Sequence, residues 1–272
     1  MTSVIKANGK KEQFSEEKVL NSIRRARIPQ NLQAEVLMHV KGKLYDGIST
    51  EEIYRHIMEF LTRAPEPYVE SRYSLKQAIM ALGPTGYPFE DFFAQLLEAN
   101  GYHTKTRQVL AGKCVTHEID VVAQKDGKTA IVEAKFHNTP GTRTEVQVAL
   151  YTQARFQDIK FRNKADESWI ITNTKATVDA ETYAICMGMK VISWDFPHEG
   201  GSLREMIERS NLHPITMLTT LSQSAKNQLL NNHIVLCKQL LEQPMILETL
   251  SLSREDREKV MAEAKVICQQ EN

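Results

Sequence analysis

Three charged residues in the middle of the chain are spaced so that they could carry out chemistry together: Asp120 in EIDVVA, and Glu133 and Lys135 in VEAKF. Two carboxylates held together repel each other unless a divalent cation neutralises them, and their hard oxygen atoms select Mg²⁺ or Mn²⁺. An ammonium beside that cation can orient a water molecule or offset the charge that grows on a phosphate in the transition state. We therefore expect Asp120 and Glu133 to bind the metal ion.

Strand alternation places the pair Glu133 and Lys135 on one face of a predicted strand over 129–136. The two residues are two positions apart, so their side chains point to the same side. The other side of this strand is apolar, as expected of a core face, and it carries Val132, Ala134 and Phe136.

A hairpin brings Asp120 to the same face. Asp126-Gly127 is a strong signal for a tight turn between the strand over 129–136 and a preceding strand over 114–123. Glu90, near the start of an earlier predicted helix, can add a third carboxylate or act as a base.

The spacing Glu-x-Lys has little specificity alone, because it occurs again at Glu263 and Lys265 and at Glu16 and Lys18. Those two copies lie in helical patterns, and we expect them to be solvated helix faces. The copy at 133–135 interrupts an otherwise apolar strand, where a charge needs a reason. The alternative is an edge strand whose polar face lies in water.

The elements around these residues alternate between helix and strand. A helix with an apolar face at 89–97 precedes a strand over 102–110 and the hairpin, and residues 144–158 return to helix. Two β-rich segments, 168–173 and 190–196, then flank a helix over 178–187. A strand, helix, strand order implies a parallel pair beside the antiparallel hairpin, which makes a mixed sheet in an α/β fold.

Four stretches between residues 84 and 198 together resemble the PD-(D/E)XK nuclease superfamily, and within it the Mrr-like, type IV restriction branch. They are PTGYPFEDFFAQLLEANGYHT, HEIDVVAQKDGKTAIVEAKFHN, VQVALYTQARF and WIITNTKATVDAETYAICMGMKVISWD. The resemblance implies a restriction-endonuclease-like mixed sheet flanked by helices. It also implies metal-dependent hydrolysis of DNA phosphodiester bonds that leaves a 5′-phosphate.

The resemblance also implies a catalytic set, which this sequence contains in full: Glu90, Asp120, Glu133, Lys135 and Gln147. Gln147 corresponds to the polar residue that Mrr-like members place beside the site. The position before the lysine is Ala134, a departure that matters little if only its backbone carbonyl contacts the metal.

Residues 1–83 are predicted to be mostly helical after a short strand that turns at Lys6-Ala7-Asn8-Gly9. Ser15 caps a helix that ends near Pro29, and Ser49 with Glu52 forms a capping box for a later helix. Residues 71–82 are predicted to form one more helix, and GPTGYP at 83–88 marks a domain boundary.

The pieces VIKANGKKEQFSEEKV, ISTEEIYRHIMEFL and YVESRYSL resemble an ATP-cone, the regulatory domain of ribonucleotide reductases. The resemblance implies ATP or dATP as a regulatory ligand, bound by Lys6, Gly9 and Lys18. A glycine turn brings backbone amides near a phosphate, and lysines add point charges. Ala7 replaces an arginine that the family usually has. The alternative is a degenerate cone that serves as a helical oligomerisation module.

Residues 199–272 contain only helical patterning, with Ser253 as the cap of a final helix that reaches residue 267. The segment faintly resembles helix-hairpin-helix modules, but it has more acidic than basic residues. An oligomerisation or packing appendage is an equal alternative. The sequence thus predicts three parts: 1–83, 84–198 and 199–272.

Composition excludes several classes of protein. The 272 residues include 34 Lys plus Arg and 34 Asp plus Glu, which excludes a histone-like polycation and an acidic tail. The four cysteines form no CxxC pair, and Cys114, His117 and His137 are poorly spaced for zinc. No apolar run is long enough for a membrane span, so we expect a soluble, cytoplasmic protein.

A local excess of basic residues points to DNA as the partner. Residues 100–175 hold 12 Lys and Arg against 8 Asp and Glu, and some of those acids belong to the expected metal site. DNA binding requires such a local basic surface. We expect it to include Lys105, Arg107, Lys113, Arg143, Arg155 and Lys160.

The sequence therefore predicts a metal-dependent DNA endonuclease that ATP or dATP regulates. Cutting both strands would favour a homo-oligomer. Two alternatives stay open at this point. One is a nucleotide-responsive DNA-binding regulator with an inactive nuclease fold, and the other is a junction-resolving nuclease.

Overall fold

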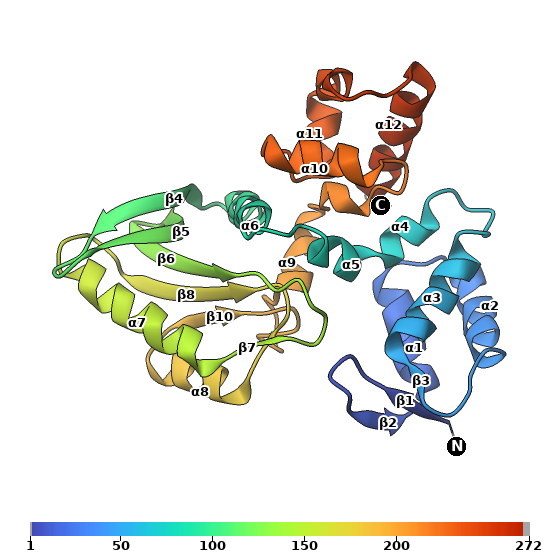
Figure 1. The fold of residues 1–272 in the computed structure, drawn as a ribbon, viewed down its shortest axis with the longest axis horizontal. Coiled ribbons are helices and arrows are strands. Elements are labelled where there is room, and N and C mark those ends of the chain that lie inside the picture. The colour runs from blue at the N-terminus through green and yellow to red at the C-terminus, as the bar shows by residue number, and fades with distance from the viewer. Residues whose placement is uncertain (1, 269–272) are drawn as a thin grey trace. The chain divides into compact units, whose positions relative to one another are not determined.

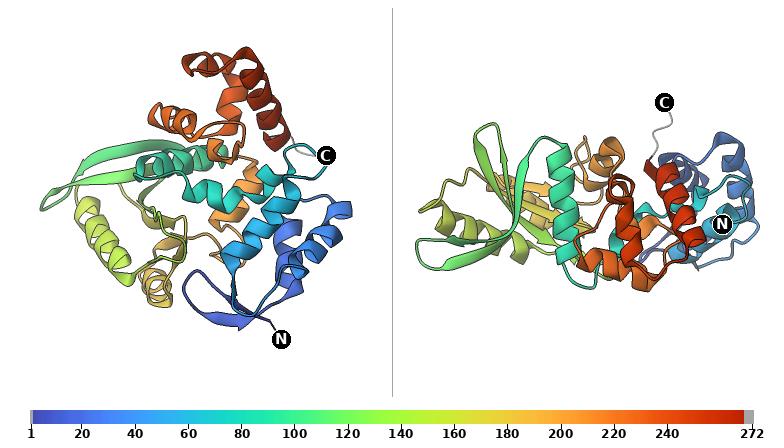
Figure 2. Two further views of the ribbon diagram at one scale, coloured as in Figure 1. Left: turned by 45° about the vertical axis from the view of Figure 1, so that its right-hand side comes forward. Right: turned by 90° about the horizontal axis from the view of Figure 1, so that it is seen from above.

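Two units make up the computed structural model, which describes residues 2–268 (Figures 1 and 2). Unit 1 holds the chain up to Ala78, then His213–Gln228, and then the chain from Cys237 onwards. Unit 2 holds Ile79–Leu212 and Leu229–Leu236. The chain thus leaves unit 1, builds most of unit 2, and returns.

Unit 1 begins with a small sheet in the strand order β2-β1-β3. β1 (Ser3–Ile5) pairs antiparallel with β2 (Lys11–Gln13) and parallel with β3 (Ile48–Ser49). The helices that follow are α1 (Glu16–Arg25), α2 (Gln30–Lys41), α3 (Thr50–Leu61), α4 (Val69–Tyr73) and α5 (Leu75–Met80). The strands β1 and β3 and the helices α1 to α4 form one core, with Val4, Ile23, Val36, Val40, Ile57 and Leu61 among its members.

The caps expected at the starts of two helices are present. The Ser15 side chain accepts from the Lys18 amide, and Ser49 with Glu52 completes the capping box of α3. Two other expectations were wrong. Helix α2, which begins directly after Pro29, was not predicted from the sequence. The helix expected over 71–82 is two helices, α4 and α5, that meet at Ser74.

The C-terminal part of unit 1 is helical, as expected. Its elements are η1 (Ile215–Met217), α10 (Gln223–Asn231), α11 (Cys237–Glu242), η2 (Pro244–Thr249) and α12 (Arg254–Cys268). The Ser253 hydroxyl accepts from the Asp256 amide at 3.1 Å and so caps α12.

Glu263 on α12 is not the solvated residue that its pattern suggested, because its side chain is 0% exposed. Its carboxylate accepts hydrogen bonds from the hydroxyl of Ser71 at 2.6 Å and from the hydroxyls of Thr219 and Thr220 at 2.8 and 2.6 Å. It also accepts from the backbone amides of both threonines. Five donors replace the water that this charge loses on burial. Lys265 is exposed, as expected.

A five-stranded mixed sheet forms the centre of unit 2, in the order β10-β8-β6-β5-β4. The strands β4 (His103–Ala111), β5 (Thr116–Lys125) and β6 (Lys128–Lys135) are antiparallel. β6, β8 (Glu167–Thr172) and β10 (Lys190–Ile192) are parallel. The mixed sheet expected from the sequence is confirmed, and the edge-strand alternative for 133–135 is excluded because β6 lies in the middle.

Helices lie on both faces of this sheet (Figure 1). Glu133 on β6 contacts α7 (Val146–Lys160), whereas the ring of Phe136, just after β6, packs on Phe89 of α6 (Tyr87–Ala99). Glu133 and Phe136 are three positions apart, so in an extended chain their side chains point to opposite sides. Helices α6 and α7 therefore cover opposite faces of the sheet. The remaining elements of unit 2 are α8 (Val178–Cys186), α9 (Leu203–Ser210) and a parallel pair of short strands, β7 (Arg143–Thr144) and β9 (Lys175–Ala176).

None of the helices within residues 2–268 combines the length and the apolar character that a membrane span needs.

Candidate active site

The ladders of the five-stranded sheet are interrupted on both sides of Asp120. Between β4 and β5 the pairing skips a single position, that of Arg107 and Asp120. The β5–β6 ladder starts at the hairpin turn and ends at the pair of Val121 and Val132. Asp120 and Glu133 are the next two positions and are no longer paired with each other. The backbone at these positions lacks these regular ladder hydrogen bonds, so its amides can bind side chains of the site.

Asp120 is held in place by the backbone of the neighbouring strand. The Ala134 amide donates to Asp120 Oδ2 at 2.7 Å. Burial, and then repulsion from Glu133, raise the pKa of the Asp120 carboxyl to about 6, although this hydrogen bond acts in the opposite direction. Only one of the two Asp120 oxygens is used by the amide, so the other can bind a ligand.

Two side chains on α7 hold Glu133. The Tyr151 hydroxyl donates to Glu133 Oε1 at 2.9 Å, and Arg155 Nη1 donates to Glu133 Oε2 at 2.5 Å. The Arg155 guanidinium also lies over the Tyr151 ring, 5.5 Å from its centroid. Tyr151 was not predicted from the sequence as a site residue, and Arg155 was expected on the DNA-binding surface.

Lys135 points to the same face as Glu133 but does not pair with it. The Lys135 side chain is partly buried, and its ammonium forms no ion pair with any of residues 2–268. Burial and the charge of Lys135 lower the pKa of His137, two residues further on. The lysine is therefore available to a substrate or to a water molecule.

Glu90 lies in the first turn of α6, with its side chain buried. Burial, and then the charge of Asp120, raise the pKa of Glu90 to about 7. Arg107 partly compensates: its guanidinium lies 3.4 Å from Glu90 Oε2 and 2.8 Å from Asp91 Oδ1. Within the described residues, Glu90, Asp120 and Glu133 do not all bring oxygens within 4.8 Å of one another.

Arg107 has a left-handed backbone, with a φ of 52°. This conformation is uncommon for a residue with a side chain and costs free energy, so the surrounding structure must enforce it. It coincides with the skipped pair opposite Asp120 and directs the guanidinium to the two acids of α6. Arg107, like Arg155, is therefore engaged with acids around the site.

Gln147 is exposed at the start of α7, one helical turn before Tyr151 and two turns before Arg155. Side chains at i, i+4 and i+8 lie along one face of a helix. Gln147 therefore shares the face of α7 that holds Glu133. This spacing, Gln147-x-x-x-Tyr151-x-x-x-Arg155, is the signal that could have found the two missed residues.

The donor set fits a divalent cation. Asp120 and Glu133 supply hard oxygen atoms, and each carboxylate oxygen has two lone pairs, so Glu133 can bind a cation while it keeps Tyr151 and Arg155. Burial, and then the charge of Glu133, raise the pKa of Asp120, so the charged form of this carboxyl is disfavoured without a nearby cation. A divalent cation would supply that positive charge.

The residues expected to bind nucleotide lie together on the first hairpin of unit 1 and on α1. Gly9 adopts a left-handed φ of 78° in the β1–β2 turn, and its amide donates to the Lys6 carbonyl at 2.8 Å. The Lys6 and Lys18 ammonium groups both contact one oxygen of Glu12, at 2.6 and 2.9 Å. Two lysines thus share one carboxylate, which leaves a net positive charge.

Three family models match consecutive parts of the chain. They are described as ATP cone domain for residues 2–79, restriction endonuclease for 83–198, and AF1548-like, C-terminal, for 213–268. The ATP-cone and restriction endonuclease domains expected from the sequence are therefore confirmed.

Two similar proteins match this chain over almost their whole length. An uncharacterized protein of Archaeoglobus fulgidus is 37% identical over 175 residues, which is 64% of this chain and 98% of that protein. The crystal structure of the protein of unknown function AF1548 is 36% identical with a TM-score of 0.59, and the match covers 67% of this chain and 98% of that one. A more distant match is the MspJI restriction endonuclease in complex with a 27-mer oligonucleotide. It is 13% identical with a TM-score of 0.37, over 73% of this chain and 40% of that one.

Proposed function

The chain belongs to the AF1548-like family, and from its restriction endonuclease domain we propose that it is a metal-dependent DNA endonuclease whose active site is formed by Asp120, Glu133 and Lys135. The observation that carries the proposal is the position of these three residues at the interrupted ladders of β5 and β6. Two partly buried carboxylates on neighbouring strands repel each other, so this arrangement is costly for stability alone. Lys135 lies beside them and forms no ion pair within residues 2–268.

The carboxylates of Asp120 and Glu133 would hold the metal ion. Mg²⁺ or Mn²⁺ bound there supplies a positive charge and Lewis acidity beside the scissile phosphate. Tyr151 and Arg155 fix the Glu133 carboxylate, and the Ala134 amide fixes Asp120, so both acids keep their orientation as substrate binds.

Lys135 would position the attacking water through its N–H groups and offset the charge that grows on the phosphate oxygens. The water oxygen bonds to phosphorus as the bond to the 3′ oxygen breaks, and that oxygen takes up a proton from solvent, which leaves a 5′-phosphate and a 3′-hydroxyl. Glu90, whose pKa of about 7 allows it both to take up and to release a proton near neutral pH, can accept the proton of the water. Gln147 lies on the α7 face where it can add a hydrogen bond to that water.

The test is cleavage of plasmid DNA and of DNA with modified bases by the full chain, with Mg²⁺ or Mn²⁺. Lys135→Ala and Asp120→Asn should each lower the rate on the order of a hundredfold or more. Lys128→Ala is the matched control, because this lysine is exposed at the other end of β6. Near-normal cleavage by both site variants would contradict the proposal.

We also propose that ATP or dATP binds the ATP cone domain, at the turn of Gly9 and beside Lys6 and Lys18, and regulates cleavage. The net positive charge of Lys6, Lys18 and Glu12 supports an anionic ligand. The same cleavage reactions with and without nucleotide test this point. A homo-oligomer that cuts both strands is part of the proposal, and light scattering measures its size.

The restriction endonuclease domain is also compatible with two other functions, which the same assays distinguish. If DNA binding and a response to ATP survive while no DNA is cut under any metal, the protein is a nucleotide-responsive DNA-binding regulator. Faster cleavage of branched than of linear DNA would instead identify a junction-resolving nuclease.

A further inference from the structure

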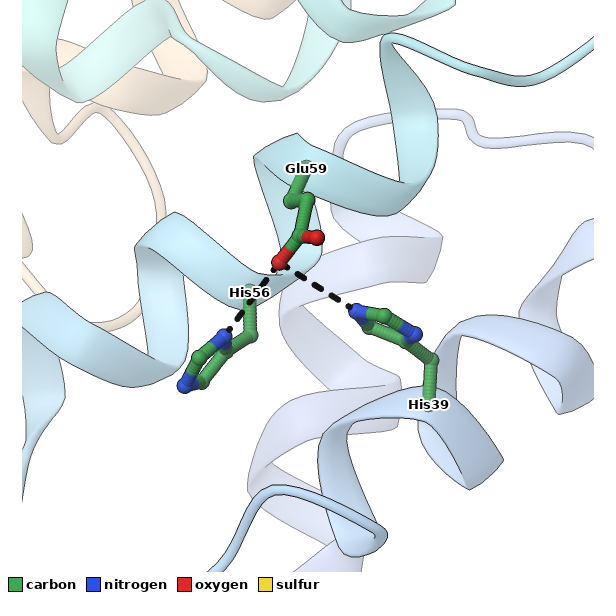
Figure 3. Close-up of side chains that lie close together, drawn as sticks. All are labelled: His39, His56 and Glu59. Atoms are coloured by element: carbon green, nitrogen blue, oxygen red, sulfur yellow. Dashed lines mark ion pairs between the residues drawn. The ribbon is translucent and has the colours of Figure 1, made fainter.

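A second group of metal-binding side chains lies in the ATP cone domain, far along the sequence from the site of Asp120. His39 comes from the last turn of α2, and His56 and Glu59 come from α3. His56 and Glu59 are three residues apart, so they share one face of their helix. Figure 3 shows the three side chains converging between the two helices.

The three ligand atoms are spaced like the donors of a small metal centre. His39 Nε2 lies 3.7 Å and His56 Nδ1 lies 3.6 Å from the same oxygen, Glu59 Oε2. All three atoms lie within 4.8 Å of one another. Both distances to the oxygen are longer than a hydrogen bond. They are close to the separation of roughly 3.3–3.5 Å between two donors that bind one tetrahedral zinc ion at about 2.0–2.1 Å.

Burial makes this group different from a surface ion pair. The side chains of His39, His56 and Glu59 are 23%, 25% and 36% exposed. His39 Nε2 itself is shielded from solvent and has no hydrogen-bond partner among residues 2–268. A buried polar atom without a partner costs free energy, and a metal bond to this nitrogen would remove that cost.

A neighbouring charge orients the carboxylate. Arg63 lies one turn beyond Glu59, and its guanidinium contacts Glu59 Oε1 at 3.3 Å. Glu59 Oε2 is therefore left facing the two imidazoles. Such a contact from outside the ligand set fixes the orientation of a ligand, as is common in metal centres.

We propose that His39, His56 and Glu59 bind a divalent transition-metal ion, Zn²⁺ being the ion that this donor set fits best. Two imidazole nitrogens and one carboxylate oxygen favour Zn²⁺ over Mg²⁺, which selects oxygen ligands. Three protein ligands leave a coordination position for water. The ion would join α2 to α3 and is distinct from the metal proposed for Asp120 and Glu133.

The experiment is a calorimetric titration of the full chain with Zn²⁺ in excess Mg²⁺, carried out in an Asp120→Asn background. This background keeps the result independent of the nuclease proposal. We expect one Zn²⁺ per chain that binds at least tenfold more weakly in His39→Gln and in His56→Gln. His103→Gln, an exposed histidine on β4, is the matched control and should bind as the parent does.

A second measurement needs no substitution in the site. Zn²⁺ should shift the imidazole nitrogen signals of His39 and His56 in nuclear magnetic resonance spectra of the folded chain, and Mg²⁺ should not. Zn²⁺ affinity that is unchanged in both glutamine variants overturns the proposal. Zn²⁺-dependent shifts confined to other histidines also overturn it.

Discussion

At the scale of single residues, two arginines that the sequence placed on a DNA-binding surface contact acids of the candidate site. Arg155 binds Glu133, and Arg107 lies between Glu90 and Asp91. Charge-assisted hydrogen bonds from an arginine fix the orientation of a carboxylate, so Arg155 orients Glu133 and Arg107 orients Glu90. The Arg107 charge also opposes the rise in the pKa of Glu90.

Arg155→Ala should lower the affinity of the full chain for Mg²⁺ and the cleavage rate about 10- to 100-fold, the scale typical of residues that orient a metal ligand. The reason is that Glu133 loses the donor on Oε2 and keeps only Tyr151. Arg162→Ala, an exposed position just after α7, is the control. Metal titration and cleavage assays measure both effects, and equal behaviour of the two variants would contradict this role.

Glu90 makes the metal-free protein less stable as the pH rises. Its pKa is raised from 4.5 to about 7, so between these values the folded protein holds a proton that the unfolded chain has lost. Stability therefore falls as the pH rises from about 4.5 to about 7, by on the order of 1–3 kcal/mol for this group. Glu90→Gln should flatten that slope. Denaturant unfolding at several pH values in a chelator measures it, and parallel curves for parent and variant would contradict it.

Strand alternation was enough to predict that Glu133 and Lys135 share a face, since it is a local property of the backbone. The partners on α7 were not predicted, because Tyr151 and Arg155 reach Glu133 across 18 and 22 residues of sequence. The backbone of Arg107 was also beyond prediction, since a left-handed arginine follows from the sheet and not from its own propensity.

At the scale of elements, the sequence predicted the strands of unit 2 well and one helix of unit 1 not at all. Val178–Cys186 and the strands around it carry clear alternation and turn signals. α2 follows Pro29, where the sequence predicts the end of a helix, although Pro is also favoured at helix starts. Its buried residues Leu32, Val36 and Val40 recur every four positions and were the missed signal.

Substitution of Glu263 should lower the free energy of unfolding more than any other substitution on α12. Glu263→Ala leaves five donors without their acceptor, among them the buried Ser71 hydroxyl, and empties a fully buried side-chain position, so we expect a loss of about 3 kcal/mol in the free energy of unfolding. Glu258→Ala, an exposed acid on the same helix, should change it by less than about 0.5 kcal/mol. Urea unfolding of both variants checks this, and similar midpoints would show that Glu263 does not hold α12 in place.

At the scale of the whole molecule, the order of domains along the sequence differs from the grouping in space. The three matched domains follow one another at 2–79, 83–198 and 213–268. In the structure, however, the C-terminal residues divide between the two units. Sequence patterns report local structure, so the return of the chain to unit 1 could not be read from them.

A chain truncated after residue 212 should therefore melt at a lower temperature than the full chain, although it keeps the whole matched restriction endonuclease domain. It loses the buried residues Leu229, Val235 and Leu236 of unit 2, and Val260 and Glu263 of unit 1. Calorimetry measures the difference. Melting at the temperature of the full chain would mean that residues beyond 212 do not support either unit.

The hydrogen bond between Ser71 and Glu263 has a consequence for biosynthesis. It joins residues 192 positions apart, and a ribosome needs roughly 10–40 s to add that many residues at about 5–20 residues per second. During that time the nascent ATP cone domain lacks the hydrogen bond to α12, and the strands of the nuclease-like sheet are synthesised before α12 is. The domain that would respond to nucleotide thus gains this hydrogen bond only after the residues of the nuclease-like sheet have been synthesised.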